Sequence, residues 1–274
     1  MLDESKARFR DFERDGWNQV AASYARVTEG VSDQIAAPLL DAAGVAEGSR
    51  LLDVATGPGW TAAAAARRGA RATGLDISSS MAEEARRRHP DITVEVAPAE
   101  EMPFADGAFD AVVSAYGMPH FFDHGAVFRE AARVLVDGGR IAVASWNPPA
   151  SNPFFAVALG SIAQCGSLDV ELPEGVDMFT WADDDACREL FTGAGFEEPE
   201  RQEVEIRIVT DDGPATVLEV LENASVRSRA LYQAQTDEAR VAIAARIAEM
   251  LEPMERDGRW TIPLSAFVVT AGRR

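Results

Sequence analysis

The chain has 274 residues, 47% of them hydrophobic, and a formal net charge of -19. This length and apolar content are typical of one globular domain and exclude extended disorder. The acidic balance disfavours nucleic acid as a partner, because phosphate backbones are bound through clustered lysine and arginine.

The cysteines, histidines and apolar runs narrow the class of protein further. Two cysteines and three histidines provide neither a disulfide framework nor a His-rich metal site, so no metal is predicted. Residues 1–15 are charged and lack the apolar region of a signal peptide. No apolar run approaches the about 18 residues of a membrane span. We therefore predict a cytoplasmic enzyme without membrane contact, and the sequence does not indicate its oligomeric state.

Taken in chain order, the first elements are helical. A polar, partly helical arm is expected at 3–15, and apolar residues at helical spacing predict helices at 17–24 and 35–43. Gly48 then breaks the chain, and a short apolar strand ends at Asp53. The turn Gly57-Pro58-Gly59 and an alanine-rich segment at 60–68 follow. This stretch is therefore interpreted as strand, tight turn and helix.

Strands and helices alternate from this turn to residue 146. Further strands are expected at 71–76, 92–96, 109–114 and 140–146. Helices are expected from about residue 78 to 88 and at 120–135. Strands alternating with helices at short spacing predict an α/β fold with a doubly wound, mostly parallel, Rossmann-like sheet.

The alternation stops after residue 146. The segment 147–182 is rich in proline, glycine and aromatic residues. A helix is expected at 183–194, a strand at 204–209, helices at 215–228 and 236–254, and a final strand at 260–271. We interpret 147–182 and 214–256 as insertions that form a helical cap over the substrate site of a single domain, 1–274.

The glycine-rich turn limits the choice of ligand. The run from Gly57 to Ala62 matches the G-x-G-x-x-A form of a dinucleotide fingerprint, and Asp76 lies near the offset of its ribose-binding acid. Asp53 weighs against a dinucleotide, because its carboxylate would face the pyrophosphate. A ligand with a cationic amino acid end and a ribose fits better, and S-adenosylmethionine has both parts.

Four motifs, in order and spacing over residues 16–146, resemble those of class I S-adenosylmethionine-dependent methyltransferases. They are the runs 52–59, 74–78, 99–104 with 109–110, and 133–135 with 138–140. The tail, with Asp257-Gly258 and Ile262-Pro263 before the last strand, resembles the small-molecule, ubiquinone-biosynthesis-like subgroup. The resemblance implies a seven-stranded sheet whose last strand is antiparallel.

The resemblance also implies the residues that hold the cofactor. The methionine-binding turn corresponds to Asp53, Gly57 and Gly59, and the ribose acid to Asp76. The apolar contacts of the adenine correspond to Ile77 and Met81, and the adenine-edge loop to Ala99 and Glu100. N-terminal helices within 1–46 close over the cofactor in this family, which places Trp17 and Tyr24 against it. Ala55 replaces the first glycine of the usual G-x-G-x-G.

Two residues are candidates for the chemistry. Tyr116 follows the fourth strand, where ligands of open α/β sheets bind, so it either faces the sulfonium and the acceptor or packs in the core. His120 is a candidate general base for a hydroxyl or amine acceptor, although the family commonly has a histidine here without a catalytic role. His89 and His124 are expected at the surface. An apolar set around the cap either lines a substrate pocket or packs the cap onto the sheet; it comprises Met118, Phe121, Phe122, Phe154, Phe155, Phe179 and Trp181.

The leading hypothesis is methyl transfer from S-adenosylmethionine to a small apolar or aromatic acceptor, at oxygen, nitrogen or carbon, with S-adenosylhomocysteine as product. Such an enzyme aligns the acceptor and excludes water, and needs no metal. The alternative is an S-adenosylmethionine-binding enzyme that catalyses a cyclisation or rearrangement without methyl transfer. A nicotinamide-dependent oxidoreductase and a non-catalytic binding protein are two further hypotheses.

Overall fold

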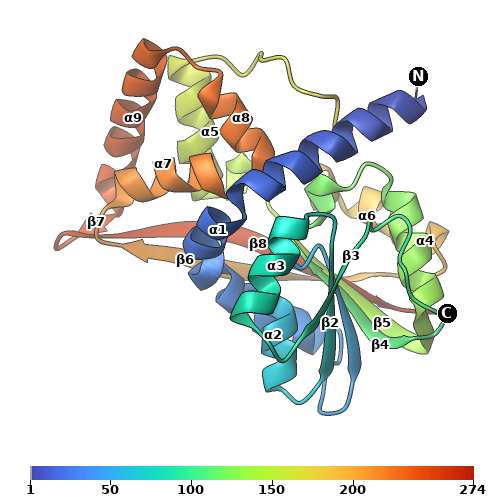
Figure 1. Ribbon diagram of the computed structural model, residues 1–274. Coiled ribbons are helices and arrows are strands. Elements are labelled where there is room, and N and C mark those ends of the chain that lie inside the picture. Colours follow the sequence, from blue (N-terminus) through green and yellow to red (C-terminus); the bar gives the residue numbers. More distant parts are fainter. Residues whose placement is uncertain (1) are drawn as a thin grey trace.

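One mixed sheet runs through the molecule, and the computed structural model describes residues 2–274 around it (Figure 1). Met1, the first residue of the predicted segments 1–46 and 1–274, lies outside the described residues. The strands follow one another across the sheet in the order β3 (Thr93–Val96), β2 (Arg71–Asp76), β1 (Arg50–Val54), β4 (Phe109–Ala115), β5 (Leu135–Trp146), β8 (Arg259–Gly272) and β6 (Glu200–Thr210).

The direction of the strands confirms the predicted fold class. Neighbouring strands from β3 to β5 pair in parallel, and β8 pairs antiparallel with both β5 and β6. A two-residue strand, β7 (Glu255–Arg256), adds a short antiparallel pair to β8 beyond the seven predicted strands. The chain leaves β1 in one direction for β2 and β3 and returns to its other side for β4, so ligands are expected where β1 and β4 end.

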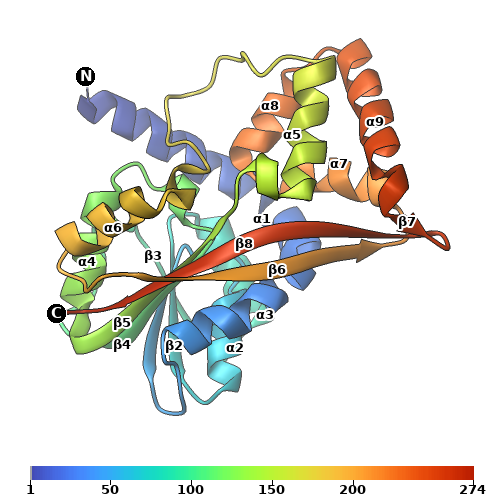
Figure 2. The same ribbon diagram turned by 180° about the vertical axis from the view of Figure 1, so that it is seen from behind.

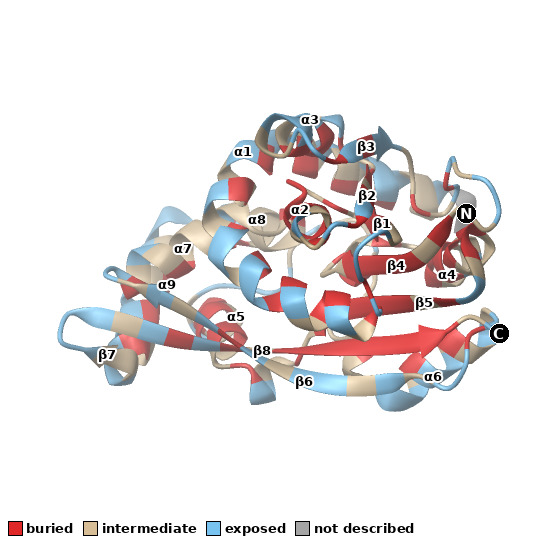
Figure 3. Ribbon diagram, turned by 90° about the horizontal axis from the view of Figure 1, so that it is seen from below, coloured by how far each residue is buried: buried red, intermediate tan, exposed pale blue. Residues whose placement is uncertain are grey.

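Helices cover both faces of the parallel part of the sheet. One face packs against α1 (Leu2–Ala42), α2 (Trp60–Arg67) and α3 (Ser79–Arg88), and the other against α4 (His124–Val134) and α6 (Asp184–Gly193). Alternate residues of β1 serve the two faces: Leu51 packs with the first group of helices and Leu52 with the second. Seen from below, the central strands β4, β5 and β8 are largely buried, whereas β6 carries many exposed positions (Figure 3).

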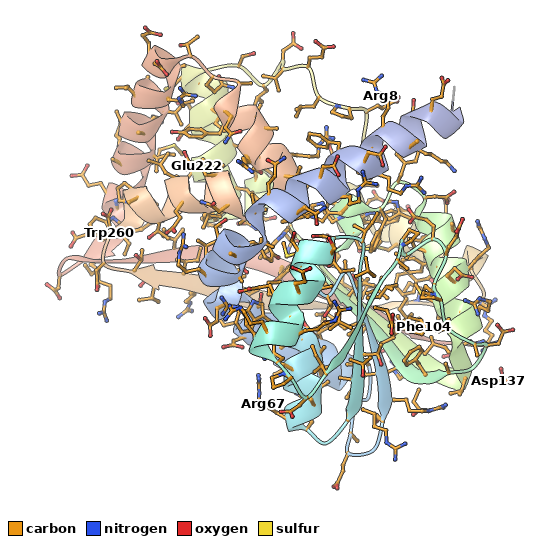
Figure 4. The ribbon with its side chains drawn as sticks, in the orientation of Figure 1. Arg8, Arg67, Phe104, Asp137, Glu222 and Trp260 are labelled. Carbon is orange, nitrogen blue, oxygen red and sulfur yellow. The ribbon has the colours of Figure 1, made fainter. Side chains whose placement is uncertain are left out.

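The remaining helices gather at one end of the molecule. They are α5 (Pro153–Cys165), α7 (Gly213–Asn223), α8 (Val226–Gln233) and α9 (Asp237–Leu251). From behind, β6 and β8 run from the parallel sheet to these helices (Figure 2). Glu222 on α7 and Trp260 at the start of β8 lie in this part of the molecule (Figure 4). We call α5, α7, α8 and α9 the cap helices.

The N-terminal segment differs from the separate arm and helices that were predicted. A single helix of 41 residues, α1, continues through Pro38, although proline removes one backbone hydrogen bond. Buried apolar residues recur along it, from Phe9 through Trp17 and Ile35 to Leu39, and packing of this face favours the continuous helix.

Three further boundaries needed tertiary information. The segment 147–182 contains α5, whose first residue is a proline in the position that helices tolerate best. The predicted helix at 215–228 is two helices, because Ser225 accepts a hydrogen bond from the Ser228 N–H and caps α8. His120 lies in a short 3-10 turn before α4, so the helix predicted from 120 begins four residues later.

Candidate active site

The glycine-rich turn after β1 is held by hydrogen bonds to its own strand and helix. Thr56 Oγ1 donates to Asp53 Oδ2 at 2.7 Å, and the Ala62 N–H donates to the same oxygen at 3.1 Å. Ala55, Gly57 and Gly59 all have positive φ angles, of 56°, 53° and 86°. Left-handed backbone favours glycine, so Ala55 at the position of the usual first glycine stores local strain.

Asp76 connects this turn to the next helix. Its Oδ2 accepts from the Gly57 N–H at 2.8 Å, and its Oδ1 accepts from the Ser78 N–H at 2.9 Å. Burial raises the pKa of the Asp76 carboxyl, and these backbone hydrogen bonds oppose the shift. The carboxylate is thereby fixed at the carboxyl end of β2, on the edge of a large cavity.

This cavity, of about 650 Å³, lies at the carboxyl ends of β1, β2, β4 and β5. Its volume is in the range of about 300–1,000 Å³ that is typical of small-molecule sites. The structure brings ten of the twelve predicted site residues to its wall: Trp17, Tyr24, Gly57, Asp76, Ile77, Met81, Ala99, Glu100, Tyr116 and His120.

Asp53 and Gly59 do not reach the wall. The Asp53 side chain is 2% exposed and turns toward Thr56 and α2, so it does not line the cavity in this structure. Its contact with the cofactor, directly or through water, stays a prediction. A Cβ on Gly59 would lie 2.9 Å from Ile92 Cδ1, so close packing favours glycine there together with its positive φ. Its role in cofactor binding stays a prediction.

The two halves of the cavity differ in chemistry. The half next to the turn carries acidic side chains, which include Glu13, Asp76, Glu100 and Glu101. The other half is bounded by apolar side chains from β5, the cap helices and the segments beside them, among them Trp146, Phe154, Phe155, Leu159, Met178 and Leu221. Lys6 and Arg10 of α1 also line the cavity. The acidic side chains beside the turn suit a cation, and the other half suits an apolar body.

Four members of the predicted apolar set line the cavity, and three do not. The lining members are Phe121, Phe122, Phe154 and Phe155. Met118, Phe179 and Trp181 pack behind the wall instead. The expectation that His124 lies at the surface is wrong: it is 8% exposed, and its Nε2 lies 2.6 Å from the Met118 carbonyl oxygen. His89 is half-buried, with its ring against that of Trp60.

Tyr116 stands between the two halves. Its φ angle is 63°, and its ring stacks on Trp146 with centroids 3.9 Å apart and planes 2° from parallel. Its hydroxyl is buried and has no hydrogen-bond partner among the described residues. Burial raises the pKa of this phenol well above 10, so the group is a neutral donor.

His120 contacts a residue that sequence reasoning missed. His120 Nδ1 lies 2.9 Å from Glu13 Oε2, and Trp17 Nε1 donates to the same oxygen at 3.1 Å. Glu13 is 2% exposed, and its other oxygen, Oε1, has no partner among the described residues. The only signal for it in the sequence is its position one helical turn before Trp17, which places both on one face of α1.

The residues present fit S-adenosylmethionine. The acidic half complements its sulfonium and ammonium, Asp76 ends β2 where a ribose acid is needed, and Ile77 with Met81 provides an apolar wall for adenine. Among residues 2–274, no group of three or more histidine, cysteine or acidic side chains is arranged to hold a metal ion. Within the same range no helix has the length and apolarity to cross a membrane.

The fold and this site define a class I, Rossmann-like enzyme that binds a nucleoside cofactor at the ends of β1 and β2. Residues 52–143 match a family model described as a methyltransferase domain. Over 118 residues the chain is 39% identical to the demethylmenaquinone methyltransferase of Beutenbergia cavernae, covering 43% of this chain and 49% of that relative. It therefore spans about half the length of this relative.

Two more comparisons agree. The demethylmenaquinone methyltransferase of Renibacterium salmoninarum is 32% identical over 171 residues, 58% of this chain and 71% of the relative. The solved structure of the YcgJ protein from Bacillus subtilis has the same fold, with a TM-score of 0.56 at 20% identity, covering 87% of this chain and 97% of the other. The chain belongs to the class I S-adenosylmethionine-dependent methyltransferases of the small-molecule type, and its cofactor is S-adenosylmethionine.

Proposed function

We propose that this enzyme transfers the methyl group of S-adenosylmethionine to a small, neutral acceptor with an apolar or aromatic body. The observation that carries the proposal is the chemistry of the acceptor half of the cavity. Among the described residues, the part of the wall contributed from Trp146 to Leu264 carries no charged side chain. An anionic or cationic acceptor would lose its hydration there without gaining a partner.

The shape of the wall favours a ring. Tyr116 and Trp146 form one flat stack, and Phe155 meets Trp146 edge to face at 5.8 Å. Aromatic pairs of this kind add about 0.5–1.5 kcal/mol to the burial of their area. The two relatives are named for demethylmenaquinone, a compound with a quinone ring. Because the transferred methyl is electrophilic, the reactive form of such a ring is the electron-rich quinol.

The residues of this chain would bind, orient and shield the reactants. The sulfonium of the bound cofactor supplies the electrophilic methyl. Asp76 would accept hydrogen bonds from the ribose hydroxyls, and Gly57 would let the cofactor approach the backbone. The Tyr116 hydroxyl would donate a hydrogen bond to the methyl acceptor, and His120 would remove the proton of the acceptor. The segments 147–182 and 214–256 would cap the acceptor, while α1, within 1–46, would exclude water.

The test of cofactor binding is calorimetry with S-adenosylhomocysteine on the wild type, Asp76→Ala and Asp137→Ala. Loss of hydrogen bonds to a charged group costs about 1.5–3 kcal/mol, so Asp76→Ala is expected to bind more than tenfold more weakly. Asp137, with its side chain 93% exposed and away from the cavity, is the matched control (Figure 4). Absence of binding by the wild type would refute the proposal.

The acceptor is tested with two rings that differ by one charge, 1,4-dihydroxynaphthalene and its 2-carboxylate. The neutral ring is expected to yield S-adenosylhomocysteine at least tenfold faster, because the part of the wall from Trp146 to Leu264 has no cation for the carboxylate. Faster turnover of the charged ring would overturn the proposed acceptor class. Conversion of an acceptor without stoichiometric S-adenosylhomocysteine would favour the alternative of cyclisation or rearrangement.

A further inference from the structure

A buried carboxylate on α1 faces a histidine that lies 107 residues away in the sequence. Glu13 is 2% exposed, and its Oε2 contacts both Trp17 Nε1 and His120 Nδ1. Its second oxygen, Oε1, is also buried and has no partner among the described residues. Glu13, Trp17 and His120 all line the cavity. A buried acid at a cavity wall calls for a reason beyond packing.

The hydrogen bonds decide which atom carries the proton. An indole N–H only donates, so the oxygen that Trp17 contacts is an acceptor. Ionised Glu13 has no proton to donate, so the hydrogen bond between that oxygen and His120 has its proton on Nδ1. A neutral imidazole with its proton on Nδ1 has its lone pair on Nε2. Among residues 2–274, no hydrogen-bond partner contacts that Nε2.

Aromatic packing fixes the plane of the same ring. The Trp17 ring meets the His120 ring edge to face, with centroids 4.9 Å apart and planes at 88°. Trp17 also meets Tyr24 edge to face at 5.1 Å. The imidazole is thereby held by one hydrogen bond and one aromatic contact, both from α1. The His120 side chain is 19% exposed, so its ring is fixed in orientation but still accessible from the cavity.

We propose that Glu13 is a positioning residue, which holds His120 in the tautomer whose Nε2 accepts a proton from the acceptor. Its carboxylate also stabilises the imidazolium that forms when the proton arrives. The use of this base in methyl transfer rests on the proposed function, whereas the positioning itself does not. The arrangement joins an oriented base to a third group, which is the general pattern of activated acid–base sites.

The proton balance of the step is simple for a hydroxyl acceptor. The hydroxyl proton goes to His120 Nε2 while the oxygen lone pair forms the bond to the methyl carbon. The electron pair of the broken carbon–sulfur bond stays on sulfur, so the positive charge passes from the sulfonium to the imidazolium. Glu13 is hydrogen-bonded to the ring that receives this charge. Asp76 is a second acid, which interacts with the same ring electrostatically.

The tautomer is tested by long-range proton–nitrogen correlation spectra of the nitrogen-labelled protein at alkaline pH. The chain has only three histidines, and loss of one set of signals in His120→Gln assigns the ring. The wild type is expected to show the Nδ1–H form. Glu13→Leu is expected to lose that form, and Glu13→Gln to retain it, because an amide oxygen still accepts the hydrogen bond.

Asp15→Asn is the matched control, since it removes a carboxylate from an exposed position of the same helix and is expected to change nothing. An Nε2–H form in the wild type would overturn the proposal. So would an unchanged tautomer in Glu13→Leu. These spectra need no acceptor, so failure of the proposed methyl transfer and failure of the positioning role are seen separately.

The catalytic consequence is measured as S-adenosylhomocysteine formed with 1,4-dihydroxynaphthalene. Glu13→Gln keeps the tautomer but loses the charge that stabilises the imidazolium, so its kcat is expected to lie between that of the wild type and that of Glu13→Leu. Glu13→Leu is expected to lower kcat about 10- to 100-fold, within the range that general base catalysis supplies. Its KM and its affinity for S-adenosylhomocysteine are expected to stay within twofold of the wild type, which excludes general damage to the fold. An unchanged kcat in Glu13→Leu, or a loss confined to its KM, would overturn the positioning role.

Discussion

Replacing Asp53 by asparagine tests whether the buried acid of the turn acts through its charge. Burial raises the pKa of this carboxyl from 3.8 to about 7, despite its hydrogen bonds from Thr56 and Ala62. A folded-state pKa above the unfolded one means that the folded protein favours the protonated form. The contribution of protonated Asp53 to the free energy of unfolding is therefore complete below about pH 4 and is lost as the pH rises through 7.

The magnitude follows from the size of the shift. A shift of about three pKa units corresponds to about 4 kcal/mol, at about 1.36 kcal/mol per unit. Asparagine is nearly isosteric, its amide oxygen accepts the same hydrogen bonds, and it does not ionise. Between pH 4 and pH 8 the free energy of unfolding of the wild type is therefore expected to fall by up to about 4 kcal/mol relative to Asp53→Asn.

The assay is urea unfolding at several pH values, followed by the fluorescence of the five tryptophans. Taking the difference between variant and wild type removes the effect of the other acids. Asp137→Asn makes the same substitution at a side chain that is 93% exposed and serves as the control. A difference for Asp53→Asn that is flat with pH, or that has the opposite slope, would refute the assignment of a buried acid with a raised pKa.

Three other substitutions probe the site and the core. In Gly74→Ala the new Cβ would lie 2.6 Å from Thr56 Cγ2, so unfolding free energy is expected to fall by about 1–3 kcal/mol in urea titrations and S-adenosylhomocysteine to bind more weakly by calorimetry. Gly30→Ala, where a Cβ meets nothing within 4 Å, is its control. Phe128→Ala removes a ring that is 1% exposed and is expected to cost about 3–5 kcal/mol, measured in the same titration. Tyr116→Phe removes an unpartnered hydroxyl, so stability is expected to rise by about 1 kcal/mol while turnover of a hydroxyl acceptor falls, and unchanged turnover would contradict the donor role.

The sheet and the cofactor half of the site were predictable because their signals are local. Each parallel strand is a short apolar run, and the acid that ends β2 lies at the cavity by virtue of its place in the strand. Gly57 and Asp76 are only 19 residues apart, and their hydrogen bond joins two consecutive units of the alternation. Such positions follow from strand order alone.

The residues that were missed or misplaced depend on contacts between distant segments. Glu13 meets His120 only because α1 lies across the ends of the strands, and no local pattern shows that meeting. His124 is buried because Trp181 packs against it, 57 residues further on. Asp53 lies at the end of β1, as strand order predicts, but its side chain accepts a hydrogen bond from the Thr56 hydroxyl and points away from the cavity. The position of a side chain along a strand follows from the sequence pattern, whereas the direction in which it points depends on the residues that it contacts.

The single helix α1 gives the two ligand sites a common wall. It contributes cavity residues from Glu4 to Ser32, and it is fastened at both sides: Asn18 accepts from Ser78 at the start of α3, and Arg26 pairs with Glu219 of α7. A displacement of this helix by one ligand therefore changes the surroundings of the other. Thermodynamic linkage then requires that cofactor and acceptor alter each other's affinity by one and the same factor. The length of one helix thus links the two binding equilibria to each other.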